Sequence, residues 1–262
     1  MKISASYNVF DGEELLEKSI SSIRDSVDFI SVVYQTKSNF GNSCSPDLED
    51  ILYNLRDKGA IQKLVKYIPD LNQRPHYNEL KKRNIGLKLG IQNNCDYHMS
   101  MDCDEFYTKD NLNFIKKTII EKQLDSIFCE IETYYKTYDT VISPPDATLV
   151  PVIYKIDMLS SFVFNSPCKF QNVDPTRRIN NRCTIFNKTK LLDRHNAVMH
   201  HMSYIRKNIR SKAENSSARV NFENEIDNFV EYYENYKSGK AMLLGKPCLF
   251  YDTVKTENIF NL

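Results

Sequence analysis

Two kinds of apolar segment alternate along the first half of the chain. Short, nearly continuous apolar runs rich in β-branched and aromatic residues are typical of buried strands. They cover residues 3–9, 29–34, 61–68, 96–101 and 126–134. Between them, apolar residues recur at helical spacing, as in Leu15, Leu16, Ile20 and Ile23. This β-α-β alternation predicts a mainly parallel sheet flanked by helices.

Local signals predict where the helices begin. Asp11 with Glu14 three residues later matches a capping box. Ser45-Pro46 places a proline at the first position of a second helix, before an apolar face that includes Leu52. Two further helices are expected over residues 75–90 and 112–122.

The second half of the chain is less regular. Prolines interrupt residues 137–181, which predicts loops with one strand over residues 150–156. Another strand is expected over residues 182–187, and the chain becomes helical from Ser203 onward. An amphipathic stripe in this helical segment is expected to pack onto the rest of the domain; it consists of Phe222, Ile226, Phe229, Val230 and Tyr233.

Composition narrows the class of protein. The 262 residues are enough for one large α/β domain, with 41% hydrophobic and 26% charged residues. A net charge of +1 gives no overall field that attracts nucleic acid. No apolar stretch resembles a signal peptide or a membrane span. The 7 cysteines form no C-x-x-C pair, so we expect reduced thiols and a cytoplasmic protein.

The strongest chemical signal is the pair Asp102 and Asp104, separated by Cys103, directly after a predicted strand. In parallel sheets, ligands bind at the carboxyl ends of strands. Two carboxylates there can hold a divalent cation, which stabilises the negative charge of a departing diphosphate. Such a pair is also common in solvated turns, so its context decides.

Two further clusters supply that context. Lys81, Lys82 and Arg83 lie on the helix that precedes the strand of the two aspartates. A solvated helix face is the usual role of such a run. His200 and His201 are followed by a series of basic residues, namely Arg206, Lys207, Arg210 and Lys212. A histidine can complete a cation site begun by carboxylates, and a mixed oxygen and imidazole set suits Mn²⁺.

Four segments together resemble glycosyltransferases of the GT-A fold, with the closest likeness to family-2-like enzymes of bacterial polysaccharide synthesis and of large DNA viruses. The segments are Ser6-Tyr7-Asn8 with Gly12-Glu13, Lys82-Arg83-Asn84-Ile85-Gly86, Met101-Asp102-Cys103-Asp104-Glu105-Phe106-Tyr107 and His200-His201-Met202-Ser203-Tyr204-Ile205-Arg206. The likeness extends through about Arg210.

The resemblance implies a single GT-A (Rossmann-like) domain over residues 1–262. Residues 1–107 would form the nucleotide-binding half, 108–202 the acceptor-side half and 203–262 a helical C-terminal segment. It also implies roles for individual side chains. Tyr7, Asn8 and Gln35 would line the nucleotide pocket, and Arg83 would reach the base or the diphosphate. Asp102 would face the ribose and the metal, Asp104 and His201 would ligate Mn²⁺ or Mg²⁺, and Arg206 and Arg210 would hold the diphosphate.

The catalytic base is not marked by a motif. Glu130 and Glu132 share one face of a predicted strand, and Asp174 lies in the proline-rich loops. An inverting enzyme needs such a carboxylate to accept the proton of the acceptor hydroxyl, whereas a retaining enzyme does not. For each of these carboxylates, a buried hydrogen bond to a tyrosine or arginine is the alternative role.

The expected activity is therefore transfer of a sugar, a hexose or deoxyhexose, from a nucleoside-diphosphate sugar to a hydroxyl of a glycan or glycoconjugate. UDP is the nucleotide that the resemblance implies. One alternative is a metal-dependent nucleotidyltransferase or phosphoesterase, which needs a glycine-rich phosphate loop or more acidic ligands; the chain has only 7 glycines. The other is a binding module without catalysis.

Overall fold

The computed structural model describes residues 1–180, 188–245 and 250–262. The strands are β1 (Ile3–Val9), β2 (Phe29–Tyr34), β3 (Lys63–Lys66), β4 (Tyr97–Asp102), β5 (Glu105–Phe106), β6 (Ser126–Tyr135), β7 (Thr140–Ser143), β8 (Leu149–Lys155), β9 (Ser161–Phe162), β10 (Ile179–Asn180), β11 (Thr189–Leu191), β12 (Val198–Tyr204), β13 (Lys240–Met242) and β14 (Phe250–Lys255). The α-helices are α1 (Glu13–Ile23), α2 (Leu48–Asp57), α3 (Pro75–Gln92), α4 (Lys109–Lys122), α5 (Ile209–Asn215) and α6 (Ile226–Asn235). Short 3₁₀ turns are η1 (Arg24–Ser26), η2 (Pro175–Arg177), η3 (Arg219–Asn221) and η4 (Glu223–Glu225).

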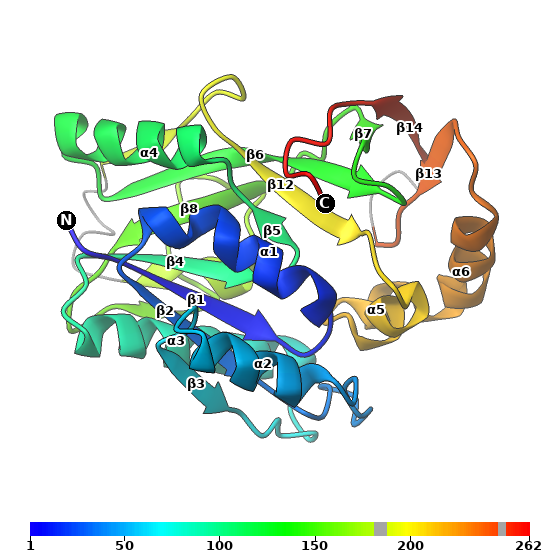
Figure 1. Ribbon diagram of the computed structural model, residues 1–262, viewed down its shortest axis with the longest axis horizontal. Helices are drawn as coiled ribbons and strands as arrows, with labels where there is room; N and C mark the ends of the chain where they lie inside the picture. Colours follow the sequence, from blue (N-terminus) through cyan, green and yellow to red (C-terminus); the bar gives the residue numbers. More distant parts are fainter. Residues whose placement is uncertain (181–187, 246–249) are drawn as a thin grey trace.

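Among the described residues, twelve of the strands form one sheet with the path β13-β14-β7-β6-β8-β4-β1-β2-β3 (Figure 1). The amino-terminal strands pair in parallel, β4 with β1, β1 with β2 and β2 with β3. The strand β8 joins β4 and β6 in antiparallel fashion, and β12 runs parallel to β6. The α/β fold with a sheet flanked by helices is thus confirmed, and its parallel strands lie mainly in the amino-terminal half.

The chain reverses its direction of strand addition between β1 and β4. The strands β2 and β3 follow on one side of β1, whereas β4 lies on its other side. In open α/β sheets such a switch point leaves a crevice outside the carboxyl ends of the two strands. Asn8 of β1 lies opposite Asp102 of β4 in the register, so both side chains belong to that edge.

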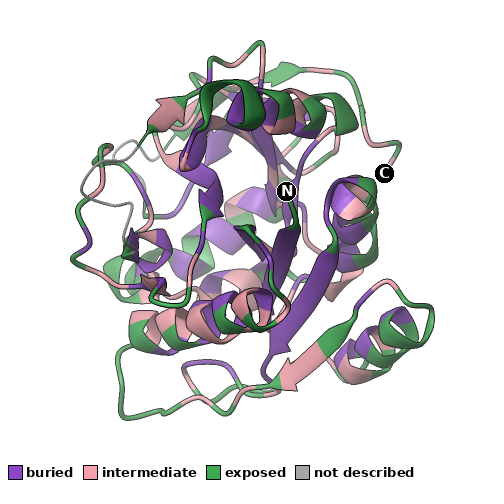
Figure 2. Ribbon diagram, turned by 90° about the vertical axis from the view of Figure 1, so that its left-hand side faces the viewer, coloured by how far each residue is buried: buried purple, intermediate pink, exposed green. Residues whose placement is uncertain are grey.

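The helices α1 and α3 cover opposite faces of β1. Tyr7 points to α1, where its hydroxyl lies 3.1 Å from Ser19 Oγ. Ser6 points to α3, and a Cβ added at Gly86 would lie 1.9 Å from its Oγ. The glycine therefore lets α3 approach the sheet closely. Figure 2 shows the resulting buried strands between helices with exposed outer sides.

Several element boundaries differ from those expected. The helix α1 begins at Glu13, with Gly12 as its N-cap at φ 75° and no side-chain cap, so the Asp11 capping box is wrong. The helix α2 begins at Leu48, so Pro46 does not occupy its first position. The predicted strand over residues 182–187 lies outside the described residues.

The C-terminal segment is not purely helical. Ser203 still belongs to β12, and the strands β13 and β14 form a hairpin that extends the sheet through β7. The predicted amphipathic stripe is buried, as expected. It packs with Tyr135, Ile142 and the segment 241–244 in a cluster of its own. In the described stretches of the chain, no helix combines the length and apolar character needed to span a bilayer.

Candidate functional site

A pocket of about 380 Å³ lies at the carboxyl ends of β1, β2 and β4, at the switch point of the sheet. Asn8, Gln35 and Asp102 reach it from the ends of these three strands. The segment from His201 to Ala218 forms its opposite wall. The other lining residues include Asp11, His76, Glu79, Lys82, Asp104, Asp174, Arg206, Lys212 and Asn215. The pocket thus brings residues of the amino-terminal strands together with residues of the C-terminal segment.

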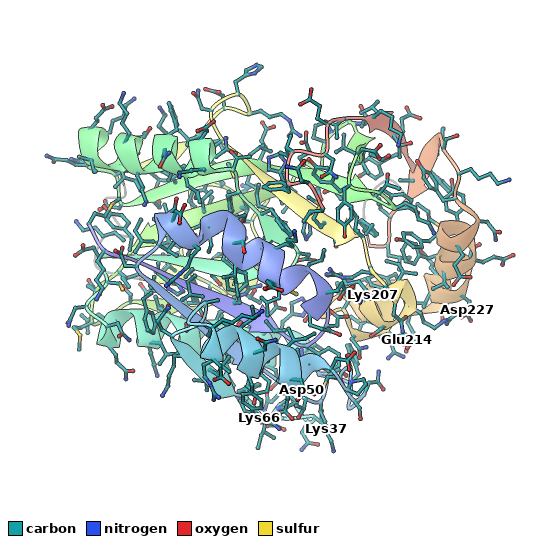
Figure 3. The ribbon with its side chains drawn as sticks, in the orientation of Figure 1. Lys37, Asp50, Lys66, Lys207, Glu214 and Asp227 are labelled. Carbon is teal, nitrogen blue, oxygen red and sulfur yellow. The ribbon has the colours of Figure 1, made fainter. Side chains whose placement is uncertain are left out.

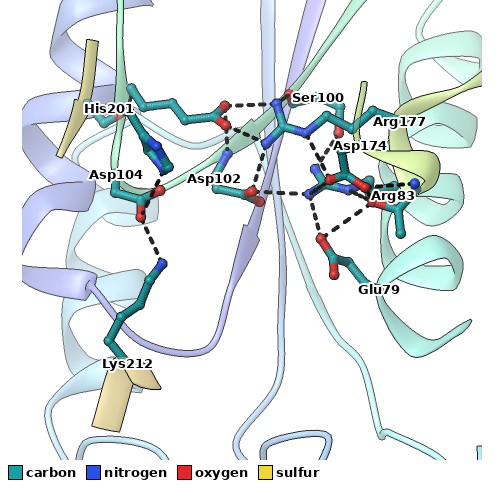
Figure 4. Close-up of polar contacts among 12 residues, drawn as sticks. Glu79, Arg83, Ser100, Asp102, Asp104, Asp174, Arg177, His201 and Lys212 are labelled. Carbon is teal, nitrogen blue, oxygen red and sulfur yellow. Dashed lines mark hydrogen bonds and ion pairs between the residues drawn. The ribbon is translucent and has the colours of Figure 1, made fainter. Parts of the chain in front are cut away.

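Asp102 is fixed by two arginines. Its Oδ2 accepts hydrogen bonds from Arg177 Nη2 at 2.7 Å and from Arg83 Nη2 at 3.1 Å (Figure 4). Burial alone would raise the pKa of this carboxyl, but the two guanidinium groups outweigh burial and hold it below its usual range. Asp102 is therefore an ionised acceptor at the pocket wall, and its orientation is set by the protein.

Arg83 does not offer its guanidinium to the pocket. Its side chain is fully buried and donates to Thr176, Ser100 and the carboxylate of Glu79 as well as to Asp102. The expected contact with a base or diphosphate would have to compete with these four acceptors, which surround the guanidinium. Arg83 positions Asp102.

Arg177 was not identified from the sequence. It lies in η2, is buried, and pairs with Glu105 and Asp102 while donating to the carbonyl oxygen of Ser100. Its proline-rich loop has no regular spacing of apolar residues, so the sequence could not predict that Arg177 contacts β4.

Asp104 is surrounded by three basic side chains from the C-terminal segment. Its Oδ2 lies 3.0 Å from Lys212 Nζ, 2.5 Å from Arg206 Nη2 and 3.6 Å from His201 Nε2. The antiparallel pairing of β5 with β12 brings them together, because it sets His201 opposite Glu105. Burial opposes ionisation of Asp104, but Lys212 and Arg206 hold its pKa well below the usual range.

Arg206 lines the pocket, and two of its buried donor nitrogens have no partner among the described residues. Only 2% of its side chain is exposed, and within the described residues Nε and Nη1 have no hydrogen-bond partner. A buried guanidinium with free N–H groups is unfavourable unless an acceptor arrives. Gly12 makes room for it, since a Cβ there would lie 2.9 Å from the guanidinium carbon. The Arg206 guanidinium therefore has donor capacity that the described residues do not use.

Lys82 is a second basic side chain of the pocket lining. It is 6% exposed, lines the pocket, and burial lowers its pKa. The sequence showed it only as a member of a basic run. Lys212 was likewise visible only as one of several bases after His201.

Asn8 and Gln35 form the wall at the ends of β1 and β2. Neither amide atom of Asn8 has a partner among the described residues, and Gln35 Oε1 has none either. Gln35 Nε2 donates to Asn39 at 3.4 Å. Both residues line the pocket, and these amide atoms have hydrogen-bonding capacity that the described residues do not use.

Two predicted nucleotide contacts lie away from the pocket. Tyr7 is fully buried on the α1 face of β1, because side chains alternate along a strand. Arg210 is exposed and pairs with Asp227 and Glu214, which lie on α6 and α5 (Figure 3). Neither residue lines the pocket, so the structure gives these two assignments no support.

The three candidates for a catalytic base lie in different surroundings. Glu132 lies away from the pocket, 2.7 Å from Arg194 Nη2 and 3.3 Å from His200 Nδ1. The hydrogen bond from His200 and the pairing with Arg194 lower its pKa to about 2. Glu130 also contacts Arg194, so both glutamates have the structural role that was the alternative. Asp174 lines the pocket, where its Oδ1 caps η2 through Thr176 and its Oδ2 lies 3.6 Å from Arg83.

The structure brings together two of the three predicted metal ligands. Asp104 Oδ2 and His201 Nε2 are 3.6 Å apart, a separation that one cation with bonds of about 2.1 Å to each can span. Asp102 instead directs Oδ2 to its arginines. Among the described residues, no group of three His, Cys, Asp or Glu side chains is arranged to hold a metal ion. The chemistry of Asp104 and His201 thus fits a cation that takes its other ligands from substrate and water.

Comparison with known proteins gives matches among solved structures alone. No protein-family model matches the chain, and no curated protein matches it either. The crystal structure of TarS from S. aureus matches with 14% identity over 77% of this chain and 37% of that chain, at a TM-score of 0.46. TarS 1–349 in complex with UDP matches with 17% identity over 59% and 47%, at a TM-score of 0.40. Its complex with UDP-GlcNAc matches with 18% identity over 51% and 35%, at a TM-score of 0.33. The chain spans less than two thirds of each TarS chain.

Proposed function

We propose that this protein is a glycosyltransferase that moves a sugar from a nucleoside-diphosphate sugar to a hydroxyl group of a glycan or glycoconjugate. The observation that carries the proposal is the pocket at the switch point of the sheet, which is lined by Arg206, a buried guanidinium whose Nε and Nη1 have no partner among the described residues. A diphosphate supplies the charge-assisted acceptors that this group lacks. Lys82 adds a second positive charge on the same pocket.

The nucleotide would lie against Asn8 and Gln35. A pyrimidine presents a donor and an acceptor side by side on its edge, which matches the two unpartnered atoms of the Asn8 amide. Among pyrimidine nucleotides, the sequence resemblance favours UDP. The diphosphate would then extend toward Arg206, on the wall opposite the strand ends.

Asp104 and His201 would hold a divalent cation, for which the mixed carboxylate and imidazole set favours Mn²⁺ over Ca²⁺. When bound, such a cation neutralises the charge that develops on the departing diphosphate. The protein side chains perform the remaining tasks. Arg206 and Lys82 orient the diphosphate, and Asp102, fixed by Arg83 and Arg177, accepts hydrogen bonds from hydroxyl groups of the donor.

Asp174 is the residue to which we assign the proton of the acceptor hydroxyl. It is the candidate carboxylate that lines the pocket, at 3.6 Å from Arg83 and 3.7 Å from Arg177, whereas the two glutamates of β6 lie outside the pocket. This assignment makes the reaction an inverting displacement, in which one carboxylate serves as general base.

Nucleotide binding tests the proposal directly. We expect UDP to raise the melting temperature of the protein more than GDP, AMP or inorganic phosphate does, and Mn²⁺ to increase the effect, because a ligand stabilises the state that binds it. We also expect release of UDP from a UDP-sugar to stop with EDTA and to return with Mn²⁺. Equal stabilisation by all nucleotides, or none by UDP, would contradict the proposal. Binding without any turnover would favour a module without catalysis.

A further inference from the structure

Lys212 contacts Asp104 from across the pocket. It lies on α5, and its Nζ is 3.0 Å from Asp104 Oδ2 (Figure 4). The two partners differ in accessibility: 30% of the Lys212 side chain is exposed, against 3% for Asp104. Lys212 is thus the partner with the more exposed side chain in a pair whose carboxylate is buried.

Two formal positive charges lie beside the single negative charge of Asp104. The buried Arg206 guanidinium already pairs with Oδ2, and one guanidinium balances one carboxylate. Lys212 adds a second formal positive charge at the same oxygen. A buried arginine and an accessible lysine on one carboxylate suggest a permanent counterion and a replaceable one.

The cation proposed for Asp104 and His201 would need the oxygen that Lys212 contacts. A divalent ion bound to Oδ2 and an ammonium group on the same atom repel each other at short distance. Arg206 approaches with a buried side chain, whereas the lysine has a flexible four-carbon stem. Lys212 is therefore the side chain that moves when the cation binds.

The structure offers room for that movement. Lys212 lines both the main pocket and a neighbouring cavity of about 280 Å³, which Ile209, Ala213 and Phe222 also line. The stem can shift along this boundary while the ammonium group stays at the rim of the main pocket. Asp11 also lines the main pocket, and a bound donor would add its phosphate oxygens there as acceptors.

We propose that Lys212 is an exchangeable counterion: it neutralises Asp104 in the empty pocket and transfers its ammonium group to the diphosphate when cation and nucleotide bind. This inference rests on the proposed function and adds a donor-binding residue to it. It predicts that one substitution changes the affinities for the cation and for the nucleotide in opposite directions. Removing the ammonium group strengthens binding of the cation alone and weakens binding of the nucleotide.

The test compares wild-type protein with Lys212→Met, using Lys207→Met as the matched control. Lys207 is an exposed lysine of the same segment that does not line the main pocket (Figure 3). Binding of Mn²⁺ without nucleotide is followed by the electron paramagnetic resonance signal of free Mn²⁺. Binding of UDP at saturating Mn²⁺ is measured by calorimetry. Melting temperatures confirm that the variants fold.

For Lys212→Met we expect the Kd of Mn²⁺ to fall several-fold and the Kd of UDP to rise about tenfold, the effect of one charge-assisted hydrogen bond. Lys212→Arg should retain most of the UDP affinity, and Lys207→Met should match wild type in both measurements. Exchange is refuted if Lys212→Met weakens both ligands, which would make Lys212 a fixed clamp, if neither affinity changes, or if Mn²⁺ does not bind wild type. A wild-type protein that binds Mn²⁺ but not UDP would instead refute the proposed function.

Discussion

At the scale of single residues, the two aspartates of the Asp102-Cys103-Asp104 segment have different neighbours and different tasks. Asp102 is held by Arg83 from α3 and Arg177 from η2. Asp104 is held by bases of the C-terminal segment. The sequence predicted the importance of both carboxylates. It could not predict which arginine meets which aspartate, since these contacts join residues up to 102 positions apart.

Arg206 provides a direct prediction. Arg206→Met removes the two unpartnered donors, so the Kd of UDP should rise roughly 10- to 100-fold, as expected for one or two hydrogen bonds to a charged group. Calorimetric titration with UDP and Mn²⁺ measures this. Arg210→Met is the matched control, because Arg210 lies outside the pocket and should be replaceable without effect. Equal losses in the two variants would contradict the assignment of Arg206.

Asp174 is tested by Asp174→Asn. Asparagine also caps a helical turn, so η2 should persist, while the loss of the base should lower kcat by roughly 10²- to 10⁴-fold. UDP affinity should stay near that of wild type. Steady-state kinetics of UDP release together with calorimetry separate the two effects. If kcat is unchanged, the proton goes elsewhere and the inverting assignment fails; Glu132→Gln should leave turnover intact in any case.

At the scale of elements, periodicity was sufficient for most of the amino-terminal half. The predicted strands over residues 29–34 and 96–101 match β2 and β4 closely, because both are buried on two faces and therefore nearly free of polar interruptions. Helix starts were harder, since α1 begins after Gly12 without any side-chain cap. The β13–β14 hairpin was missed because its pairing with β7 depends on residues about 110 positions away.

The contact of α3 with β1 gives a prediction for stability. Gly86→Ala places a methyl group 1.9 Å from Ser6 Oγ, so one of the two elements must shift, at a cost of roughly 1–3 kcal/mol in the free energy of unfolding. Denaturant unfolding measures the loss. Ser6→Gly should restore some of it by removing the clash, whereas Lys88→Ala on the exposed side of α3 should change stability by less than about 0.5 kcal/mol. Absence of rescue would mean that the cost has another cause.

At the scale of the whole molecule, the net charge of +1 does not show that many charged side chains are gathered at one site. Basic side chains from α3, β12 and α5 converge on acidic residues at the edge of the sheet. Composition could not show this local arrangement. The site was predictable as a motif, and its electrostatics became visible only with the fold.

Ion pairs of this kind make stability depend on pH. The pKa of Glu132 falls from 4.5 to about 2 in the folded protein, because it accepts a hydrogen bond from His200 and pairs with Arg194. The stabilising contribution is therefore fully present above about pH 4.5 and is lost as pH falls toward 2. Glu132→Gln should lower the melting temperature at neutral pH, and the difference from wild type should shrink in acid. A constant difference across that range would show that the charge of Glu132 is not responsible.

Because residues 206 and 212 supply the counterions of Asp104, the C-terminal segment neutralises a buried charge at the edge of the sheet. A protein shortened to its first 203 residues would keep every strand that carries Asn8, Gln35 and Asp102, yet it would leave a buried carboxylate without its cations. Such a buried, uncompensated charge is strongly destabilising. The nucleotide-binding half and the C-terminal segment therefore cannot be exchanged independently between related chains: a chimera must carry matching partners on both sides of the junction.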